Sequence, residues 1–312
     1  MQSVDLLINE RMFSEHAPLI HELTNHLINA GGKRLRPLLT LASAKMCGYS
    51  GQHHIHLAAI VELIHTATLL HDDVIDESLQ RRGKPTANML WDNKSSVLVG
   101  DYLFARAFQL MVEVESIGVL NSLSSASAKI SESEVLQMSL AKNLAATSSQ
   151  YFQVINGKTA TLFSSACEVG GLISNTNPNQ VKALSLYGEA LGISFQIVDD
   201  FLDYAGLDSD LGKNIGDDFR EQKITLPIIR SLENKHSKNL DFWERTLAKG
   251  KQREDDFKTA QKILSTDGSL EKVRLEALKW ADLAKSQLKL LPVCDIKTSL
   301  CDLTDFVISR VT

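Results

Sequence analysis

Two short groups of aspartates, each at the end of an apolar stretch, carry the strongest chemical signal in this sequence. The first group is Asp72, Asp73 and Asp76, and the second is Asp199, Asp200 and Asp203. Both have the spacing D-D-x-x-D, which places residues three and four apart on one face of a helix. Like charges at that spacing repel, and a cation between them relieves the repulsion. Mg²⁺ suits this role, because it binds one or two carboxylates and leaves its other positions to water and phosphate oxygens.

The repetition of the motif is more informative than either copy. A single D-D-x-x-D is most often a solvated acidic helix end, but here the same kind of apolar run precedes both copies. Two helices that face each other, each with a carboxylate cluster at the same depth, would hold several Mg²⁺ ions around one polyphosphate. The pattern therefore predicts a shared metal site and a phosphate-bearing substrate.

Basic side chains suited to phosphate occur before the first acidic group. Two glycines free the backbone ahead of Lys33 and Arg36, which we expect on one side of a helix's first turn. A loop, a helix N-terminus and fixed positive charge together make a phosphate site. The alternative is a solvated basic turn. Taken by itself, this motif slightly favours the solvated turn over the phosphate site. His65 lies seven residues before Asp72 on about the same helix face, so it is either a phosphate ligand or a core histidine.

Two further pairs of polar residues invite comparison with phosphate sites. Arg81 and Arg82 follow the first acidic group, where they either balance its charge or offer forked donors to phosphate oxygens. Lys158 and Thr159 stand in G-K-T-A, which resembles the tail of a P-loop. Phe152 occupies the position where that motif requires glycine, and this excludes a P-loop. Both residues remain candidates for a charge and a hydroxyl beside a cavity.

Two further segments are rich in loop-forming or metal-binding residues. Residues 205–223 contain three glycines and alternating charges, which predicts a mobile loop, acting as a lid in which Lys213 and Lys223 close over phosphates. The histidines at 53, 54 and 56 suggest a metal site, but we favour a polar loop that leads into a helix from about Ile55.

The composition excludes several classes of protein. In 312 residues the net charge is −5, which disfavours bulk attraction to nucleic acid. No uncharged apolar run approaches the ~18 residues of a membrane span, and charged residues near the start argue against a signal peptide. The four cysteines form no C-x-x-C pair, so we expect reduced thiols. We predict one all-α domain over residues 1–312, in the cytoplasm, with at most loose membrane contact for product release.

Six motifs, in order, resemble those of the trans-isoprenyl diphosphate synthases. They are G-G-K-R-L-R-P at 31–37, L-L-H-D-D-V-I-D at 69–76, R-R-G-K at 81–84, G-K-T-A at 157–160, F-Q-I-V-D-D-F-L-D at 195–203 and L-G-K-N-I-G-D-D at 211–218. The resemblance covers about 31 to 227 and is strongest to the bacterial long-chain members, the octaprenyl diphosphate synthase group. It implies the isoprenoid synthase fold, with helices around a deep central cavity, and a homodimer.

The resemblance also implies a role for each matching position. Mg²⁺, as three ions when substrate is bound, would be held by Asp72, Asp76 and Asp199, with support from Asp73, Asp200 and Asp203. The allylic diphosphate would contact Arg81, Lys158, Lys213 and Lys223. Isopentenyl diphosphate would contact Lys33, Arg36, His65 and Arg82. Thr159 and Gln196 would line the reaction centre. The predicted catalytic residues are the three that would hold Mg²⁺ directly, the four that would contact the allylic diphosphate, and the pair at the reaction centre: Asp72, Asp76, Asp199, Arg81, Lys158, Lys213, Lys223, Thr159 and Gln196.

This chemistry needs no side-chain nucleophile, and the sequence shows none. Diphosphate becomes a good leaving group once cations neutralise its charge. The allylic cation is then attacked by the double bond of isopentenyl diphosphate, and a proton is lost to the departing diphosphate. Two positions depart from the family pattern: Ile224 stands where many members have proline, and Gly157 where relatives often carry a polar residue.

Small residues before the first acidic group predict a long product. Ala67 and Thr68 are small, whereas bulky residues at these family positions block the growing tail. The tail can then pass Ile64 along a helix, and ~20 helical residues span ~30 Å. Met138 or Leu140 on another helix is the predicted floor of the cavity. We expect farnesyl diphosphate as the primer, octaprenyl diphosphate as the product and quinone side chains as its destination.

Four alternatives remain at this stage. A shorter-chain geranylgeranyl or farnesyl diphosphate synthase shares every motif. An HD-type metal phosphohydrolase would use His71 and Asp72 with the histidines at 53–56, but it leaves the second acidic motif unexplained. A terpene cyclase would want Ser or Thr at Asp203, and a non-catalytic partner subunit would normally lack one acidic cluster.

Overall fold

The computed structural model of this chain describes residues 1–29, 31–81, 83–205, 215–233 and 239–311. Helices form nearly all of the regular structure in these ranges, and the all-α prediction is confirmed. The exception is a short antiparallel hairpin of β1 (Gln80–Arg81) and β2 (Lys84–Pro85), in which Arg81 pairs with Lys84. The predicted loop at R-R-G-K is therefore a hairpin, and Gly83 in its turn has a φ of +73°, which favours glycine.

The described chain divides into two compact units, each built from three separate segments. Unit 1 comprises Met1–Ser127, Leu162–Gly188 and Leu290–Lys297, and unit 2 comprises Ala128–Thr161, Glu189–Lys289 and Thr298–Thr312. Four helices have described residues in both units: α7 (Ile117–Leu140), α9 (Thr161–Ile173), α10 (Pro178–Ala205) and α17 (Asp295–Ile308). The expectation of one domain over the whole chain stays a prediction.

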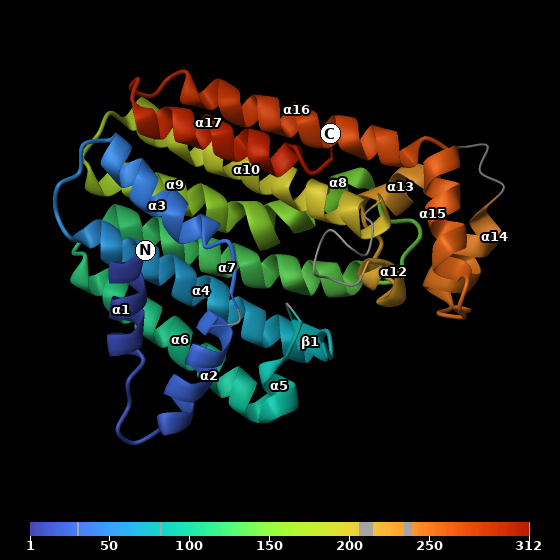
Figure 1. Cartoon of the computed structure of the whole chain (residues 1–312), viewed down its shortest axis with the longest axis horizontal. Helices are drawn as coiled ribbons and strands as arrows, with labels where there is room; N and C mark the ends of the chain where they lie inside the picture. The colour runs from blue at the N-terminus through green and yellow to red at the C-terminus, as the bar shows by residue number, and fades with distance from the viewer. Residues whose placement is uncertain (30, 82, 206–214, 234–238, 312) are drawn as a thin grey trace. The chain divides into compact units, whose positions relative to one another are not determined.

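Unit 1 is organised around α4 (His53–Ile75), which runs beside α6 in Figure 1. The other helices that begin in this unit are α1 (Gln2–Arg11), α2 (Pro18–Asn29), α3 (Leu35–Met46), α5 (Ala87–Leu90) and α6 (Asn93–Glu113). Helix α4 contacts α1, α3, α5 and α6. Its segment from Leu57 to Leu63 is almost fully buried, because nearly every side chain there is apolar. The exception, Glu62, pairs with Arg34 at 2.6 Å between Oε1 and Nη1.

Helix α9 (Thr161–Ile173) also belongs almost entirely to unit 1, and glycines allow it to pack closely. A Cβ at Gly170 would lie 2.6 Å from the backbone nitrogen of Ala44 on α3. A Cβ at Gly188 on α10 would collide with the carbonyl oxygen of Phe163. Helix α9 therefore packs backbone to backbone against α3 and against the first half of α10.

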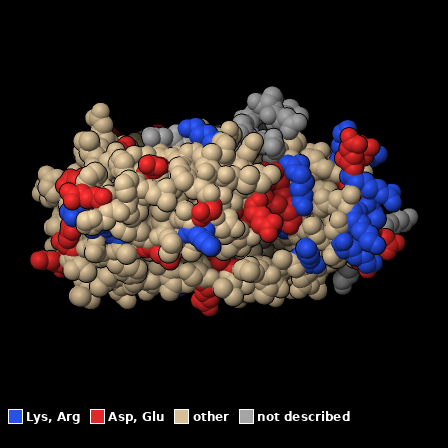
Figure 2. All heavy atoms as spheres, turned by 90° about the horizontal axis from the view of Figure 1, so that it is seen from below, with Lys and Arg blue, Asp and Glu red and all other residues tan. Residues whose placement is uncertain are grey.

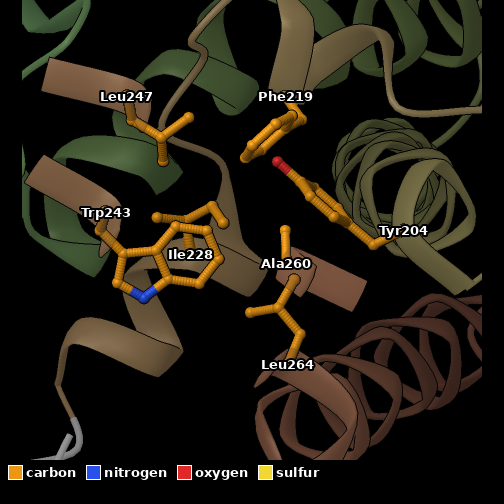
Figure 3. Packing of buried hydrophobic residues seen from close by; sticks show 7 residues of the cluster. All are labelled: Tyr204, Phe219, Ile228, Trp243, Leu247, Ala260 and Leu264. Atoms are coloured by element: carbon orange, nitrogen blue, oxygen red, sulfur yellow. The ribbon is translucent and has the colours of Figure 1, made fainter. Parts of the chain in front are cut away.

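Unit 2 holds the remaining helices and a hydrophobic cluster of its own. The elements are α8 (Ser148–Ile155), the π-helical turn η1 (Asn156–Ala160), α12 (Asp217–Arg220), α13 (Leu226–Leu232), α14 (Leu240–Trp243), the π-helical turn η2 (Glu244–Ala248), α15 (Asp256–Thr266) and α16 (Ser269–Leu288). Figure 3 shows the cluster, formed by Tyr204, Phe219, Ile228, Trp243, Leu247, Ala260 and Leu264. It joins the end of α10 to α12, α13 and the helices after 239, so these later helices support the second acidic motif.

Candidate active site

The first acidic motif lies at the C-terminal end of α4, where its three aspartates differ in exposure. Asp73 is only 1% exposed, and Arg81 from β1 donates to its Oδ1 through Nε at 2.9 Å, with Nη2 at 2.7 Å. Asp72 and Asp76 are half-buried. Asp73 therefore links the β1–β2 hairpin to α4. Asp72 and Asp76 are the members of this motif that solvent reaches.

Two residues predicted to hold isopentenyl diphosphate contact each other in unit 1. Arg36 Nη1 lies 3.2 Å from His65 Nε2, and the Arg36 guanidinium stacks over the Phe163 ring at 4.5 Å from its centroid. Lys33 is exposed and precedes the helix, which begins only at Leu35. The expectation that Lys33 shares the first helical turn with Arg36 is therefore wrong, because the left-handed backbone of Arg34, with φ +48°, lies between them. Arg82 lies outside the described residues.

The positions predicted to set product length lie along α4 before the acidic motif. Ile64 and Ala67 are fully buried, and Thr68 is half-buried with its hydroxyl donating to the His65 carbonyl at 2.7 Å. Met138 on α7 is 61% exposed, so the described side chains do not enclose it. Its assignment as a cavity floor stays a prediction.

The histidines at 53, 54 and 56 belong to α4 itself. The helix begins at His53, two residues earlier than expected, so the predicted polar loop is part of its first turns. The 16 residues that separate His56 from Asp72 on this one helix span about 24 Å at ~1.5 Å per residue. That separation excludes the phosphohydrolase site in which these histidines join His71 and Asp72.

The second acidic motif lies at the end of α10, and its middle aspartate is part of a buried hydrogen-bond chain. Tyr151 donates to Asp200 Oδ2 at 2.7 Å, and Gln196 Nε2 donates to Oδ1 at 2.8 Å. Thr159 donates in turn to Gln196 Oε1 at 2.8 Å. The structure therefore brings together Thr159, Gln196 and Asp200, and it adds Tyr151, which the sequence analysis did not select.

The carboxylate of Asp203 accepts hydrogen bonds from three backbone amides. The N–H groups of Gly216 and Asp217 donate to its Oδ1 at 3.0 and 3.1 Å, and that of Asp218 donates to Oδ2 at 3.1 Å. These amides precede or begin α12, so the carboxylate of one helix caps the next. Residues 215–223 of the predicted mobile loop are thus an ordered turn and helix, whereas Lys213 and the rest of the predicted lid, 206–214, lie outside the described residues.

The carboxylate of Asp199 pairs with an arginine near the end of the chain. Arg310 Nη1 lies 3.1 Å from Asp199 Oδ1, and the two side chains are 21% and 28% exposed. This ion pair joins the second acidic motif to the C-terminal segment of the described chain.

Lys158 and Thr159 lie in η1, where the helix widens for one turn. Such π-helical turns inside helices recur at functional sites. Lys158 Nζ lies 2.9 Å from Glu134 Oε1 on α7, which neutralises the lysine within unit 2. Lys223, just after α12, pairs with Glu221 at 2.6 Å. Both predicted diphosphate contacts thus have acidic partners in this structure.

Burial and mutual repulsion raise the pKa values of the carboxyls around the second motif. Desolvation raises the pKa of Asp200 to about 7, against the lowering effect of its Tyr151 and Gln196 hydrogen bonds. Desolvation also raises the pKa of Asp203 to about 6. The pKa of Asp218 rises well above its usual value through desolvation and the charges of Asp200 and Asp203. A divalent cation nearby would favour the ionised forms of all three.

These residues fit Mg²⁺ by donor chemistry. Mg²⁺ prefers carboxylate, water and phosphate oxygens, and the half-buried carboxylates of Asp72, Asp76 and Asp199 offer the first of these. Within the ranges that the structure describes, no three His, Cys, Asp or Glu side chains already converge as a metal cage. Figure 2 shows a face on which acidic side chains form a patch that directly adjoins basic ones, among mostly neutral atoms.

Three site residues escaped the sequence analysis: Tyr151, Glu134 and Arg310. None lies in a recognisable motif, and each acts on a partner at least 24 positions away, as Glu134 does on Lys158. A pairing between residues so far apart in the chain leaves no local sequence pattern. Tyr151 does lie about two helical turns before Lys158, in α8, which continues directly into η1.

The chain belongs to the polyprenyl synthetase family, whose model matches residues 17–264. It is accordingly a prenyltransferase enzyme, of a family that in general depends on metal, usually Mg²⁺. None of the helices within the described residues is both long and apolar enough to cross a bilayer.

Several characterised relatives match almost the whole chain. The octaprenyl diphosphate synthase of Escherichia coli is 39% identical over 310 residues, covering 99% of this chain and 95% of the relative. The all-trans-nonaprenyl-diphosphate synthase of Rhodobacter capsulatus is also 39% identical, covering 99% and 94%. Among solved structures, a decaprenyl diphosphate synthase from Rhodobacter capsulatus has a TM-score of 0.97 at 56% identity, covering 100% of this chain and 96% of the other. The predicted isoprenoid synthase fold is thereby confirmed.

A second solved relative carries bound ligands. The polyprenyl synthase of Caulobacter crescentus, in complex with calcium and isoprenyl diphosphate, has a TM-score of 0.95 at 46% identity and covers 100% of this chain and 95% of that one.

Proposed function

We propose that this chain is a long-chain trans-prenyl diphosphate synthase that adds isopentenyl diphosphate repeatedly to an allylic diphosphate, with octaprenyl diphosphate as its main product. The observation that carries the proposal is the division of roles within both acidic motifs. Asp73 and Asp200 are buried and engaged by neighbouring side chains, whereas Asp72, Asp76 and Asp199 are half-buried. Buried partners hold the motif in shape, and the half-buried carboxylates are those that a hydrated ion can reach.

Each residue then has a part in the condensation. Asp72, Asp76 and Asp199 would hold Mg²⁺, as three ions with substrate, and the bound ions supply the charge that makes diphosphate a leaving group. Arg81, Lys158 and Lys223 bind the allylic diphosphate. Arg36 and His65 bind isopentenyl diphosphate, and the contact between them, together with the Phe163 ring, orients the guanidinium.

The reaction balances without a covalent enzyme intermediate. The allylic C–O bond breaks, and its electron pair leaves with the diphosphate. The double bond of isopentenyl diphosphate forms the new C–C bond at that carbon, and a proton passes to the released diphosphate. Thr159 and Gln196 line this centre, and their part-buried hydrogen bond keeps both side chains fixed during the step.

The small side chain of Ala67 supports a long product through the family resemblance, in which bulky residues at this position block the growing tail. The relatives named for octaprenyl and nonaprenyl products agree with this assignment, although a geranylgeranyl diphosphate synthase of Saccharolobus solfataricus is 37% identical over 300 residues. The family resemblance also favours a homodimer, which sedimentation of the purified protein would test.

Product analysis tests the proposal directly. The purified protein is incubated with Mg²⁺, farnesyl diphosphate and labelled isopentenyl diphosphate, and the products are sized by mass spectrometry. We expect a dominant octaprenyl diphosphate. A dominant geranylgeranyl or farnesyl product would contradict the long-chain assignment, and phosphate release without C–C bond formation would contradict the reaction itself.

A further inference from the structure

Tyr151 lies at the buried end of the hydrogen-bond chain that reaches the proposed reaction centre. Its side chain is 6% exposed, and its hydroxyl donates to Asp200 Oδ2 at 2.7 Å. Asp200 is itself 4% exposed. A hydroxyl so placed stabilises the carboxylate by a charge-assisted hydrogen bond, which is stronger than a neutral one.

The carboxylate in turn fixes which way the Gln196 amide points. The structure places the Gln196 NH₂ against Asp200, with Nε2 donating to Oδ1 at 2.8 Å, and a deprotonated carboxylate oxygen only accepts such bonds. The flipped amide would set its oxygen against the carboxylate, and the two would repel. Gln196 Oε1 therefore faces Thr159, at 2.8 Å.

The orientation of Gln196 determines what Thr159 offers to a substrate. A hydroxyl has one proton to donate and two lone pairs that accept. Because Oε1 accepts the only proton of Thr159, the threonine oxygen can present only lone pairs in other directions. A Thr159 that lacked this partner would be free to turn its proton outward.

We propose that Tyr151 is a positioning residue, which holds Asp200 so that the chain through Gln196 keeps Thr159 in its lone-pair-presenting orientation. The inference rests on the proposed function, because it assigns Thr159 to the reaction centre. Tyr151 touches no reacting atom and acts only through this chain. Its ring also packs edge-on against Phe152 at 5.4 Å between centroids, a contact that phenylalanine keeps.

Kinetics of Tyr151→Phe alone and with Thr159→Val test the coupling. We expect Tyr151→Phe to lower kcat about tenfold with little change in KM for either diphosphate. In the Thr159→Val background the same substitution should have almost no further effect, since neighbours in one network are not additive. Tyr102→Phe is the control for loss of a phenol hydroxyl, because the Tyr102 hydroxyl accepts from Arg106 within unit 1 and takes no part in this chain. Its effect on kcat should combine additively with Thr159→Val.

A spectroscopic measurement on the metal-free protein separates this inference from the proposed function. The side-chain amide resonances of Gln196 are identified by their loss in Gln196→Met. Tyr151→Phe should shift them, and Tyr102→Phe should leave them in place. Unchanged Gln196 resonances in Tyr151→Phe, or additive effects of Tyr151→Phe and Thr159→Val on kcat, would overturn the inference. Absence of prenyl transfer by the wild-type protein would instead overturn the proposed function, while the amide shift would still decide the role of Tyr151.

Discussion

Asp203 shares its motif with a proposed metal ligand, yet its carboxylate accepts three backbone N–H groups from residues 216–218. Asp203→Asn would replace one acceptor with an NH₂ group that faces a donor. We expect a loss of about 1–3 kcal/mol of stability, the cost of leaving buried polar groups unsatisfied. Amide hydrogen exchange at 216–218 should accelerate. Exchange that stays unchanged while Mg²⁺ affinity collapses would show that Asp203 is a metal ligand instead.

The ion pair of Arg310 with Asp199 places a cation where we propose that Mg²⁺ binds. Partly exposed pairs of this kind are worth about 0.2–1 kcal/mol. Arg310→Gln should therefore tighten Mg²⁺ binding by roughly 1.4- to fivefold in the absence of substrate, as measured by calorimetry. Lys285→Gln, which breaks the pair with Asp305, serves as the control for loss of a positive charge. Weaker Mg²⁺ binding in Arg310→Gln alone would contradict this competition.

Helix α4 connects burial, metal binding and product length in one element. Its apolar residues before Asp72 anchor it against α3 and α6, so the acidic end is held by the rigid part of unit 1. The same burial makes the side-chain volume at Ala67 consequential, since packed interiors tolerate added atoms poorly.

The substitution Ala67→Tyr should shorten the product, because the phenol ring would fill the path that we propose for the growing tail. Chromatographic sizing of the products measures the change. Leu275→Tyr, at a position on α16 that is 52% exposed, controls for the added ring and should leave the length unchanged. A length distribution in Ala67→Tyr equal to that of the unsubstituted protein would show that the tail runs elsewhere.

At the scale of the whole molecule, the central prediction is that both acidic motifs bind one group of ions. Asp72→Ala and Asp199→Ala should each lower kcat by about 10²-fold or more, because each removes charge stabilisation of the leaving group. If the ions are shared, the double variant should bind Mg²⁺ with inorganic diphosphate hardly more weakly than either single variant. Additive losses, measured by calorimetry, would indicate two independent sites. Asp241→Ala, an exposed aspartate on α14, controls for the charge change.

The sequence alone was sufficient to predict the helical class and the family, and it selected the two acidic motifs as candidates for the site. These follow from signals that are local in the chain, such as the D-D-x-x-D spacing and the apolar period of α4. Through the resemblance, the sequence also assigns Asp73 and Asp200 a supporting role in metal binding, and that role stays a prediction. Helix starts were less accurate, as at His53 and at Lys33, because cap geometry and a left-handed Arg34 shift a boundary by one or two residues.

Only the tertiary structure decided which partners each polar side chain has. Arg81 with Asp73, Arg36 with His65, and Tyr151 with Asp200 are pairs from different elements. Such pairs depend on how helices pack, and packing is set by the sum of many weak contacts spread along the chain. Short sequence motifs therefore indicate which chemical groups the candidate site contains, whereas the orientation of these groups can be seen only in the folded structure.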